Sequence, residues 1–141
     1  GCAQLDKIES FVEKRRHNFD MLKSGLAGFN DKIILPEACD NSRPSWFGFL
    51  ITCREGIDKN KVVGYLESKG IQTRMLFGGN MLKQPCFADM KKENEGYRVI
   101  GDLKVTDTIM NNTFWIGVYP GMTDEMTGYM IDCLKDCLSN M

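Results

Sequence analysis

The segment with the clearest chemical potential is residues 73–80 (TRMLFGGN). Arg74 carries a planar guanidinium group that suits phosphate or carboxylate ligands. The Gly-Gly-Asn end of the segment tolerates positive φ angles, so its backbone N–H groups can converge on one point and form an anion-binding nest. Phe77 lies between these groups and can cover a sugar or base ring. A plain glycine turn beside a surface arginine has the same composition, so both interpretations remain open.

The other reactive residues form no catalytic or metal-binding pattern. Six cysteines occur without a C-x-x-C pair, and only Cys133 and Cys137 have a spacing that places two thiols on one helix face. A zinc or iron–sulfur site needs about four ligands, so we predict no metal site and reduced thiols. His17, the single histidine, follows two arginines and is interpreted as a surface residue. Because the sequence has no serine-hydrolase, zinc-protease or P-loop motif, we expect no catalytic residue in this chain.

Length and composition limit the function further. The chain has 141 residues, of which 43% are hydrophobic and 26% charged, with a net charge of −1. This length fits one domain with its own core. Nucleic-acid binding is not expected, because the chain lacks a basic excess. A membrane partner is not expected either, because no apolar run approaches the roughly 18 residues of a membrane span.

Hydrophobic periodicity and capping residues predict the elements that position the 73–80 segment. The predicted helices span 3–26, 58–69 and 106–111, and a last helix begins after residue 123; the predicted strands span 46–53, 71–76 and 114–118. The expected N-caps are Asp58, Thr106 and Thr123, and Gly70 is the expected C-terminal stop of the second helix. Residues 77–101 are predicted to be a long irregular loop that contains a charged run at 91–95.

This order of elements predicts an α/β fold of the two-layer α+β kind. We expect a short mixed sheet of about three strands, with helices mainly on one face. The strand–helix–strand unit at 46–76 is expected to be a crossover between parallel strands.

Several motifs together resemble one known family. The most specific part combines Thr73-Arg74 with Phe77, Gly79-Asn80 and Gln84-Pro85; further agreement lies in residues 3–7 (AQLDK), 13–18 (EKRRHN), 42–49 (SRPSWFGF) and 112–117 (NTFWIG). These motifs resemble the C-terminal portion of the DegT/DnrJ-type sugar aminotransferases. Within that family, the chain is most similar to the nucleotide-sugar 3-dehydratase branch of lipopolysaccharide O-antigen synthesis. The resemblance spans essentially the entire chain and is weakest at residues 91–96.

The resemblance implies the small C-terminal domain of a fold type I enzyme that uses pyridoxal phosphate (PLP). In this family the residue at the Schiff-base position lies in the large N-terminal domain and is lysine in the aminotransferases and histidine in the dehydratase branch. Iron–sulfur cysteines, in the members that have them, also lie upstream. None of these residues matches a position here, so His17 and the six cysteines inherit no such role. PLP, and any iron–sulfur cluster, are therefore expected in the parent protein and no cofactor in this chain.

The expected organisation is one small domain, residues 1–141, that is a fragment of a longer enzyme and inactive alone. Residues 1–28 are expected to form a long helix that links to the missing large domain. The start at residues 1–3 (GCA) has no N-cap residue, and this is interpreted as the seam between the two parts.

The resemblance assigns substrate-side roles to five residues: Trp46, Arg74, Phe77, Asn80 and Gln84. Arg74 is expected to contact a phosphate of the substrate or cofactor, Asn80 to donate a hydrogen bond from the loop tip, and Phe77 and Trp46 to form walls. In the alternative interpretation, Arg74 and Gln84 only hold loop 77–87 in place. The implied parent is a cytoplasmic homodimer that binds a nucleotide sugar of the CDP-4-keto-6-deoxyglucose type.

Three other functions fit the sequence. The same domain occurs in nucleotide-sugar aminotransferases. A non-catalytic anion-binding or interaction module would use the nest at residues 78–80, and a purely structural module would pack on a partner. Truncation predicts an exposed apolar face that includes one side of helix 3–26.

Overall fold

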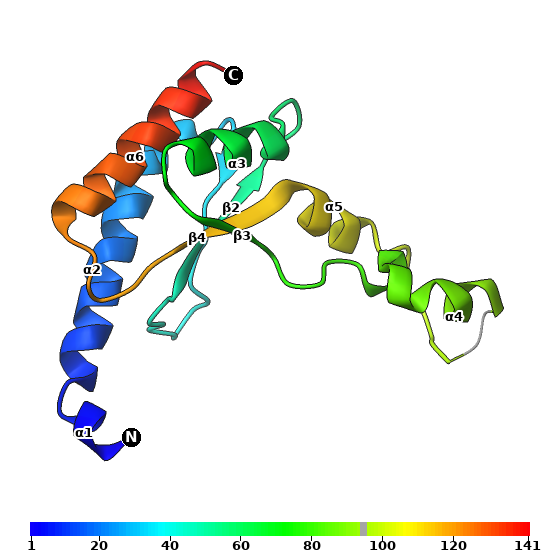
Figure 1. Cartoon of the computed structure of the whole chain (residues 1–141), viewed down its shortest axis with the longest axis horizontal. Coiled ribbons are helices and arrows are strands. Elements are labelled where there is room, and N and C mark those ends of the chain that lie inside the picture. Colours follow the sequence, from blue (N-terminus) through cyan, green and yellow to red (C-terminus); the bar gives the residue numbers. More distant parts are fainter. Residues whose placement is uncertain (94–95) are drawn as a thin grey trace.

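The computed structural model describes residues 1–93 and 96–141 and centres on a four-stranded antiparallel sheet (Figure 1). The strand order is β1 (Ile33–Ile34), β2 (Gly48–Cys53), β4 (Thr113–Gly117) and β3 (Thr73–Met75). The expected helix-on-sheet arrangement is confirmed, but the mixed sheet of about three strands is wrong. The strand count is wrong because β1 has two residues, too few for an alternating pattern to reveal it. The direction is wrong because β4 lies between the parallel strands β2 and β3, so every pair of neighbouring strands is antiparallel.

The register of β4 separates the two faces of the sheet. Phe114 and Ile116 point to one face and are fully buried, whereas Trp115 lies between them on the opposite face. Trp115 pairs with Leu50 of β2 and with Arg74 of β3. Arg74 therefore lies on the face away from the core.

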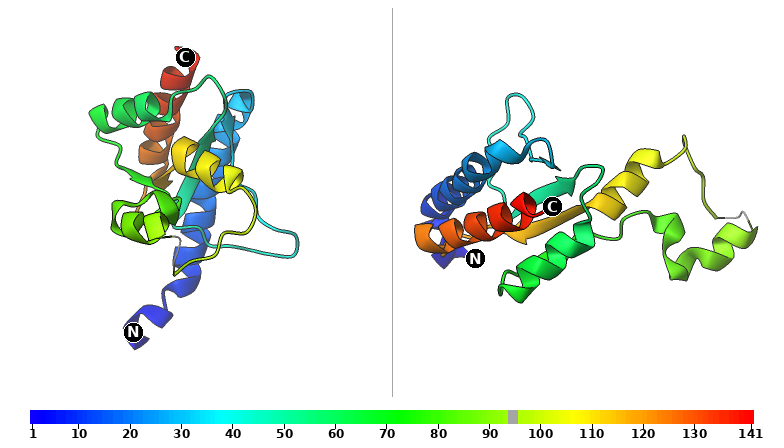
Figure 2. Two further views of the ribbon diagram at one scale, coloured as in Figure 1. Left: turned by 90° about the vertical axis from the view of Figure 1, so that its right-hand side faces the viewer. Right: turned by 90° about the horizontal axis from the view of Figure 1, so that it is seen from above.

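Three helices cover the other face: α2 (Ile8–Leu26), α3 (Lys59–Ser68) and α6 (Asp124–Ser139). Figure 2 shows α2 and α6 side by side, with α3 also against α6. The core formed by these helices and the sheet includes Leu22, Leu26, Phe49, Ile51, Val62, Leu66, Phe114, Ile116, Leu134 and Leu138. None of the helices in the described residues is long and apolar enough to cross a bilayer.

The caps of α3 and α6 are confirmed. The Asp58 carboxylate accepts the N–H of Asn60 at 2.8 Å, and the Thr123 hydroxyl accepts the N–H of Met126 at 3.1 Å. Gly70 has a φ of +76° immediately after α3, as a C-terminal stop requires.

The single helix predicted over residues 3–26 is wrong at its start. The structure has a short helix α1 (Cys2–Leu5), a turn at Asp6 and Lys7, and then α2. Nothing buries α1, and Leu5 and Ile8 remain more than half exposed, so no packing enforces one continuous helix. Leu5 and Ile8 thus leave an apolar side of this end exposed.

Residues 77–101 contain more structure than the predicted irregular loop. They include the 3-10 helices η2 (Met81–Lys83) and η3 (Pro85–Phe87) and the helix α4 (Ala88–Glu93). Together with α5 (Lys104–Asn112), they form an arm that projects away from the sheet (Figures 1 and 2). The predicted charged run at 91–95 extends into residues 94–95, outside the described residues.

Helix α5 begins earlier than predicted, and its expected cap is wrong. Leu103 occupies the N-cap position with a φ of +55° and supplies no side-chain hydrogen bond. Thr106 lies inside the first turn instead. A threonine before a helical pattern indicates an N-cap only when its backbone is extended, and the Leu103 turn places the helix start upstream.

We predict that Thr123→Ala lowers the free energy of unfolding by about 1 kcal/mol, because the first turn of α6 loses an acceptor for its Met126 N–H. Thr106→Ala is the matched control and should change it by only a few tenths of a kcal/mol. Chemical denaturation measures both. Equal losses at the two positions would contradict the cap assignment.

Candidate functional site

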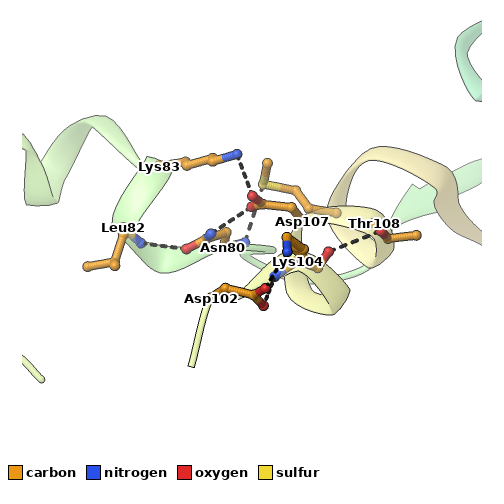
Figure 3. Close-up of polar contacts among 8 residues, drawn as sticks. Asn80, Leu82, Lys83, Asp102, Lys104, Asp107 and Thr108 are labelled. Carbon is orange, nitrogen blue, oxygen red and sulfur yellow. Dashed lines mark hydrogen bonds and ion pairs between the residues drawn. The ribbon is translucent and has the colours of Figure 1, made fainter. Parts of the chain in front are cut away.

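A polar cluster joins the loop after β3 to helix α5 (Figure 3). The Asn80 side chain is almost fully buried, at 4% exposed. Its carbonyl Oδ1 accepts the N–H of Leu82 at 3.1 Å, and its Nδ2 donates to Oδ1 of Asp107 at 2.7 Å. The other carboxylate oxygen of Asp107 pairs with Nζ of Lys83 at 2.8 Å. One carboxylate on α5 thus holds two residues of the loop.

A methionine on the same helix supports the loop backbone. The N–H of Asn80 points at Sδ of Met110, 3.3 Å away. Gly79 has a φ of +61°, and a Cβ atom there would lie 2.4 Å from Cγ of Met110. Only glycine satisfies both the dihedral angle and the space. The predicted anion nest at residues 78–80 is therefore wrong in its last member, because that N–H already has a partner.

Gln84 and Phe77 define the two ends of the loop. Gln84 Nε2 donates to the Gly78 carbonyl at 2.5 Å, which fits the interpretation that Gln84 holds the loop in place. Phe77 has a φ of +48° and donates its N–H to the Met75 carbonyl at 2.9 Å. Its side chain is 79% exposed. A bulky residue in the left-handed region is strained, so the backbone conformation that exposes this ring carries an energetic cost.

Arg74 lies at a cleft of about 780 Å³, within the usual size range of small-molecule sites. Trp115 and Tyr119 line it from β4 and the following turn, and Tyr129 from α6. The methionines of the lining are Met122, Met126 and Met130, and Glu125 adds one acidic group. No hydrogen bond or ion pair joins the exposed Arg74 side chain to another described residue. The guanidinium is thus available to an anion.

Trp46 is the one predicted site residue that the structure places elsewhere. Its ring stacks on Phe19 of α2, with centroids 5.2 Å apart and planes 11° apart, and Phe19 in turn contacts Phe49 in the core. Trp46 therefore lies on the helix-covered side of the sheet, opposite Arg74. Arg74, Phe77, Asn80 and Gln84 lie along one strand and loop. The substrate-side roles of all five residues remain predictions.

Sequence reasoning missed the partners that shape this region. Asp107 and Met110 are about 30 residues from Asn80 along the chain, and no local motif links them. The cleft aromatics Tyr119 and Tyr129 were also missed.

Ionisable groups also lie outside the cleft. Burial raises the pKa of Cys53 to about 11, so its thiol stays protonated at neutral pH. His17 forms an exposed pair with Asp124 at 2.9 Å. Within residues 1–93 and 96–141, no three potential metal ligands come together. The described residues that line the cleft include no lysine, whose amine would form the Schiff base, so they do not fit the covalent attachment of PLP.

The fold defines a class of protein. It superposes on the Escherichia coli enzyme GDP-4-keto-6-deoxy-D-mannose-3-dehydratase, solved with bound hydrated PLP, with a TM-score of 0.80 and 23% identity. The match covers 95% of this chain and 33% of that chain. The architecture is therefore that of the small domain of fold type I PLP enzymes.

The family follows from the sequence match. Residues 1–135 match the model of the DegT/DnrJ/EryC1/StrS aminotransferase family, and the chain belongs to this family. It is 49% identical over 138 residues to the lipopolysaccharide biosynthesis protein RfbH of Salmonella typhimurium, covering 96% of this chain and 30% of that protein. It is 40% identical to the dTDP-4-dehydro-2,6-dideoxy-D-glucose 3-dehydratase of Saccharopolyspora spinosa, covering 96% and 29%. The chain thus spans about 30% of the length of these relatives.

We predict that Gly79→Ala destabilises the protein more than Gly70→Ala does. Both positions have positive φ, which costs an alanine roughly 1–2 kcal/mol. A new Cβ at Gly79 also collides with Met110, whereas nothing lies within 4 Å of one at Gly70. Denaturant titration of the two variants measures the difference. Equal destabilisation would contradict the close approach of the loop to α5.

Proposed function

We propose that this chain is the substrate-closing small domain of a PLP-dependent nucleotide-sugar 3-dehydratase in deoxysugar and lipopolysaccharide O-antigen synthesis. The observation that carries the proposal is the 49% identity to RfbH along 96% of the chain. The named 3-dehydratase of Saccharopolyspora spinosa supports the reaction class over the same span. The family also contains aminotransferases, and the same domain in a nucleotide-sugar aminotransferase is the alternative.

The proposed substrate is a nucleotide sugar of the CDP-4-keto-6-deoxyglucose type, and the proposed whole enzyme is a cytoplasmic homodimer. Arg74 is well suited to the substrate's diphosphate, because its fork of N–H donors has no partner among the described residues. Trp115 shares its face of the sheet and, with the cleft tyrosines, offers flat surfaces for a ring. Phe77 lies in the loop that follows β3, and its exposed ring can contact the substrate from there.

The proposal gives the chain a binding role and no proton-transfer or covalent step. The cleft has the size and aromatic lining of a ligand site, but its described lining includes no lysine amine for a Schiff base with PLP. Orientation of the substrate and exclusion of water are the contributions that these residues can make. The Schiff-base residue and any iron–sulfur ligands are proposed to belong to the rest of the enzyme.

We predict that Arg74→Ala weakens the binding of CDP-glucose, used here as a stand-in for the keto sugar, at least tenfold. A charge-assisted hydrogen bond contributes about 1.5–3 kcal/mol, and 1.4 kcal/mol corresponds to a factor of ten. Titration of the chain followed by NMR measures the affinity and shows which residues respond. Arg54→Ala is a charge-matched control, because Arg54 follows β2 and donates to Asn30 on the β1 side of the sheet.

Two results would contradict the proposal. One is the absence of saturable shifts with CDP-glucose, GDP-mannose and dTDP-glucose. The other is binding that Arg74→Ala and Arg54→Ala weaken equally, which would indicate a general charge effect.

A further inference from the structure

The role of Asp107 goes beyond that of an ordinary surface carboxylate. It lies in the first turn of α5, where a negative charge is favourable, but its oxygens point to another element. One accepts from Asn80 Nδ2 at 2.7 Å and the other pairs with Lys83 Nζ at 2.8 Å. By contrast, the nearby Asp102 pairs with Lys104, two residues away on its own segment. Asp107 therefore connects α5 to the loop after β3, whereas the ion pair of Asp102 stays within its own segment.

The connection closes a ring of contacts around the loop. Strand β3 leads into residues 77–84, and the loop is held by Asp107 and Met110 on α5 (Figure 3). Helix α5 runs directly into β4, which pairs with β3. Lys59 of α3 donates to the Met110 carbonyl at 2.9 Å and ties α5 to the body. The loop is thus connected to the sheet at its start through β3, and at Asn80 and Lys83 through α5. Asp107 supplies the polar contacts to α5.

Two features of the loop require such support. Asn80 is buried, so its Nδ2 group depends on a protein acceptor in place of water. Phe77 holds a positive φ, a conformation that persists only where the surroundings enforce it. Bonds from Lys83 and from Asn80 lower the pKa of the Asp107 carboxyl, so it is ionised at neutral pH and accepts through both oxygens.

We propose that Asp107 is a positioning residue, which acts through Asn80 and Lys83 to hold residues 77–84 in the conformation that presents Phe77 to the ligand. Only the identity of the ligand, a nucleotide sugar, rests on the proposed function. The conformational role stands on the contacts of Asp107 itself.

The test measures amide hydrogen exchange in the full chain at neutral pH. The reporters are Leu82 N–H, which donates to Asn80 Oδ1, and Lys83 N–H, which donates to the Asn80 carbonyl at 2.9 Å. Asp107→Ala should reduce the protection of both amides at least tenfold. Asp102→Asn, which alters a local carboxylate of the same arm, should leave them unchanged.

A second variant separates the two contacts and guards against loss of fold. Asp107→Asn keeps an acceptor for Asn80 and removes the charge that pairs with Lys83, so it should give an intermediate loss of protection. If Asp107→Ala loses protection in the core amides as well, Asp107→Asn becomes the deciding variant. Unchanged protection of Leu82 and Lys83 in the variants that retain their fold would overturn the proposal.

The pH dependence of the Leu82 amide shift reports the ionisation of Asp107, which a change in side-chain shape alone would not affect. A carboxyl with a lowered pKa stabilises the fold above its ordinary pKa, and this is lost as pH falls through the lowered value. The Leu82 amide shift should therefore titrate below the ordinary range of aspartate, and this transition should be absent in Asp107→Asn. Of the neighbouring cations, Lys83 pairs with this carboxylate, Lys104 with Asp102, and Lys59 donates to Met110. A transition that persists in Asp107→Asn would contradict the assignment.

Nucleotide-sugar titrations of the same variants separate this proposal from the proposed function. If the unaltered chain binds no nucleotide sugar while Asp107→Ala frees the loop, the proposed function fails and the positioning role stands. If the loop stays protected in Asp107→Ala, the positioning role fails whatever the chain binds.

Discussion

The alternation of side chains along β4 is the constraint on which the rest of the structure depends. Because β4 lies between β2 and β3, its register sets which face each neighbouring residue occupies. Phe114 and Ile116 are buried under the helices, and Trp115 must therefore lie on the other side with Arg74. A shift of β4 by one residue would turn Trp115 toward the helices and expose Phe114 and Ile116. The hydrophobic core and the candidate ligand cleft are thus two consequences of one strand register.

The loop after β3 adopts a conformation that its own sequence does not favour. Phe77 is a bulky residue with a positive φ, and Asn80 is a polar residue that is buried. The compensation comes from α5, through the Asp107 carboxylate and the Met110 side chain. Local strain that distant contacts support is common where a protein presents groups to a ligand. The arm that looks separate in Figure 1 is therefore coupled to the sheet through this loop.

Family membership and the geometry of the cleft both agree with the proposed binding role of this chain. The chain matches its relatives along 96% of its own length but spans about 30% of theirs. Among the described residues, its cleft offers an arginine without a hydrogen-bond partner, aromatic surfaces, and no lysine. A domain of this kind can orient and enclose a substrate while the bond-making groups come from elsewhere. The proposed binding role is therefore consistent with a sequence in which we predict candidate ligand-binding residues and no catalytic residue.

The sequence by itself determined the family, the two-layer architecture, and the caps at Asp58 and Thr123, because these depend on motifs and periodicity within short stretches. It also placed Arg74 and Phe77 on one strand and loop. Only the tertiary structure decided that β4 separates β2 from β3, that Trp46 belongs to the helix side, and that Asp107 holds Asn80. These relations join residues tens of positions apart. Local spacing carries no information about them, since packing and the satisfaction of buried polar groups are settled only when the whole chain folds.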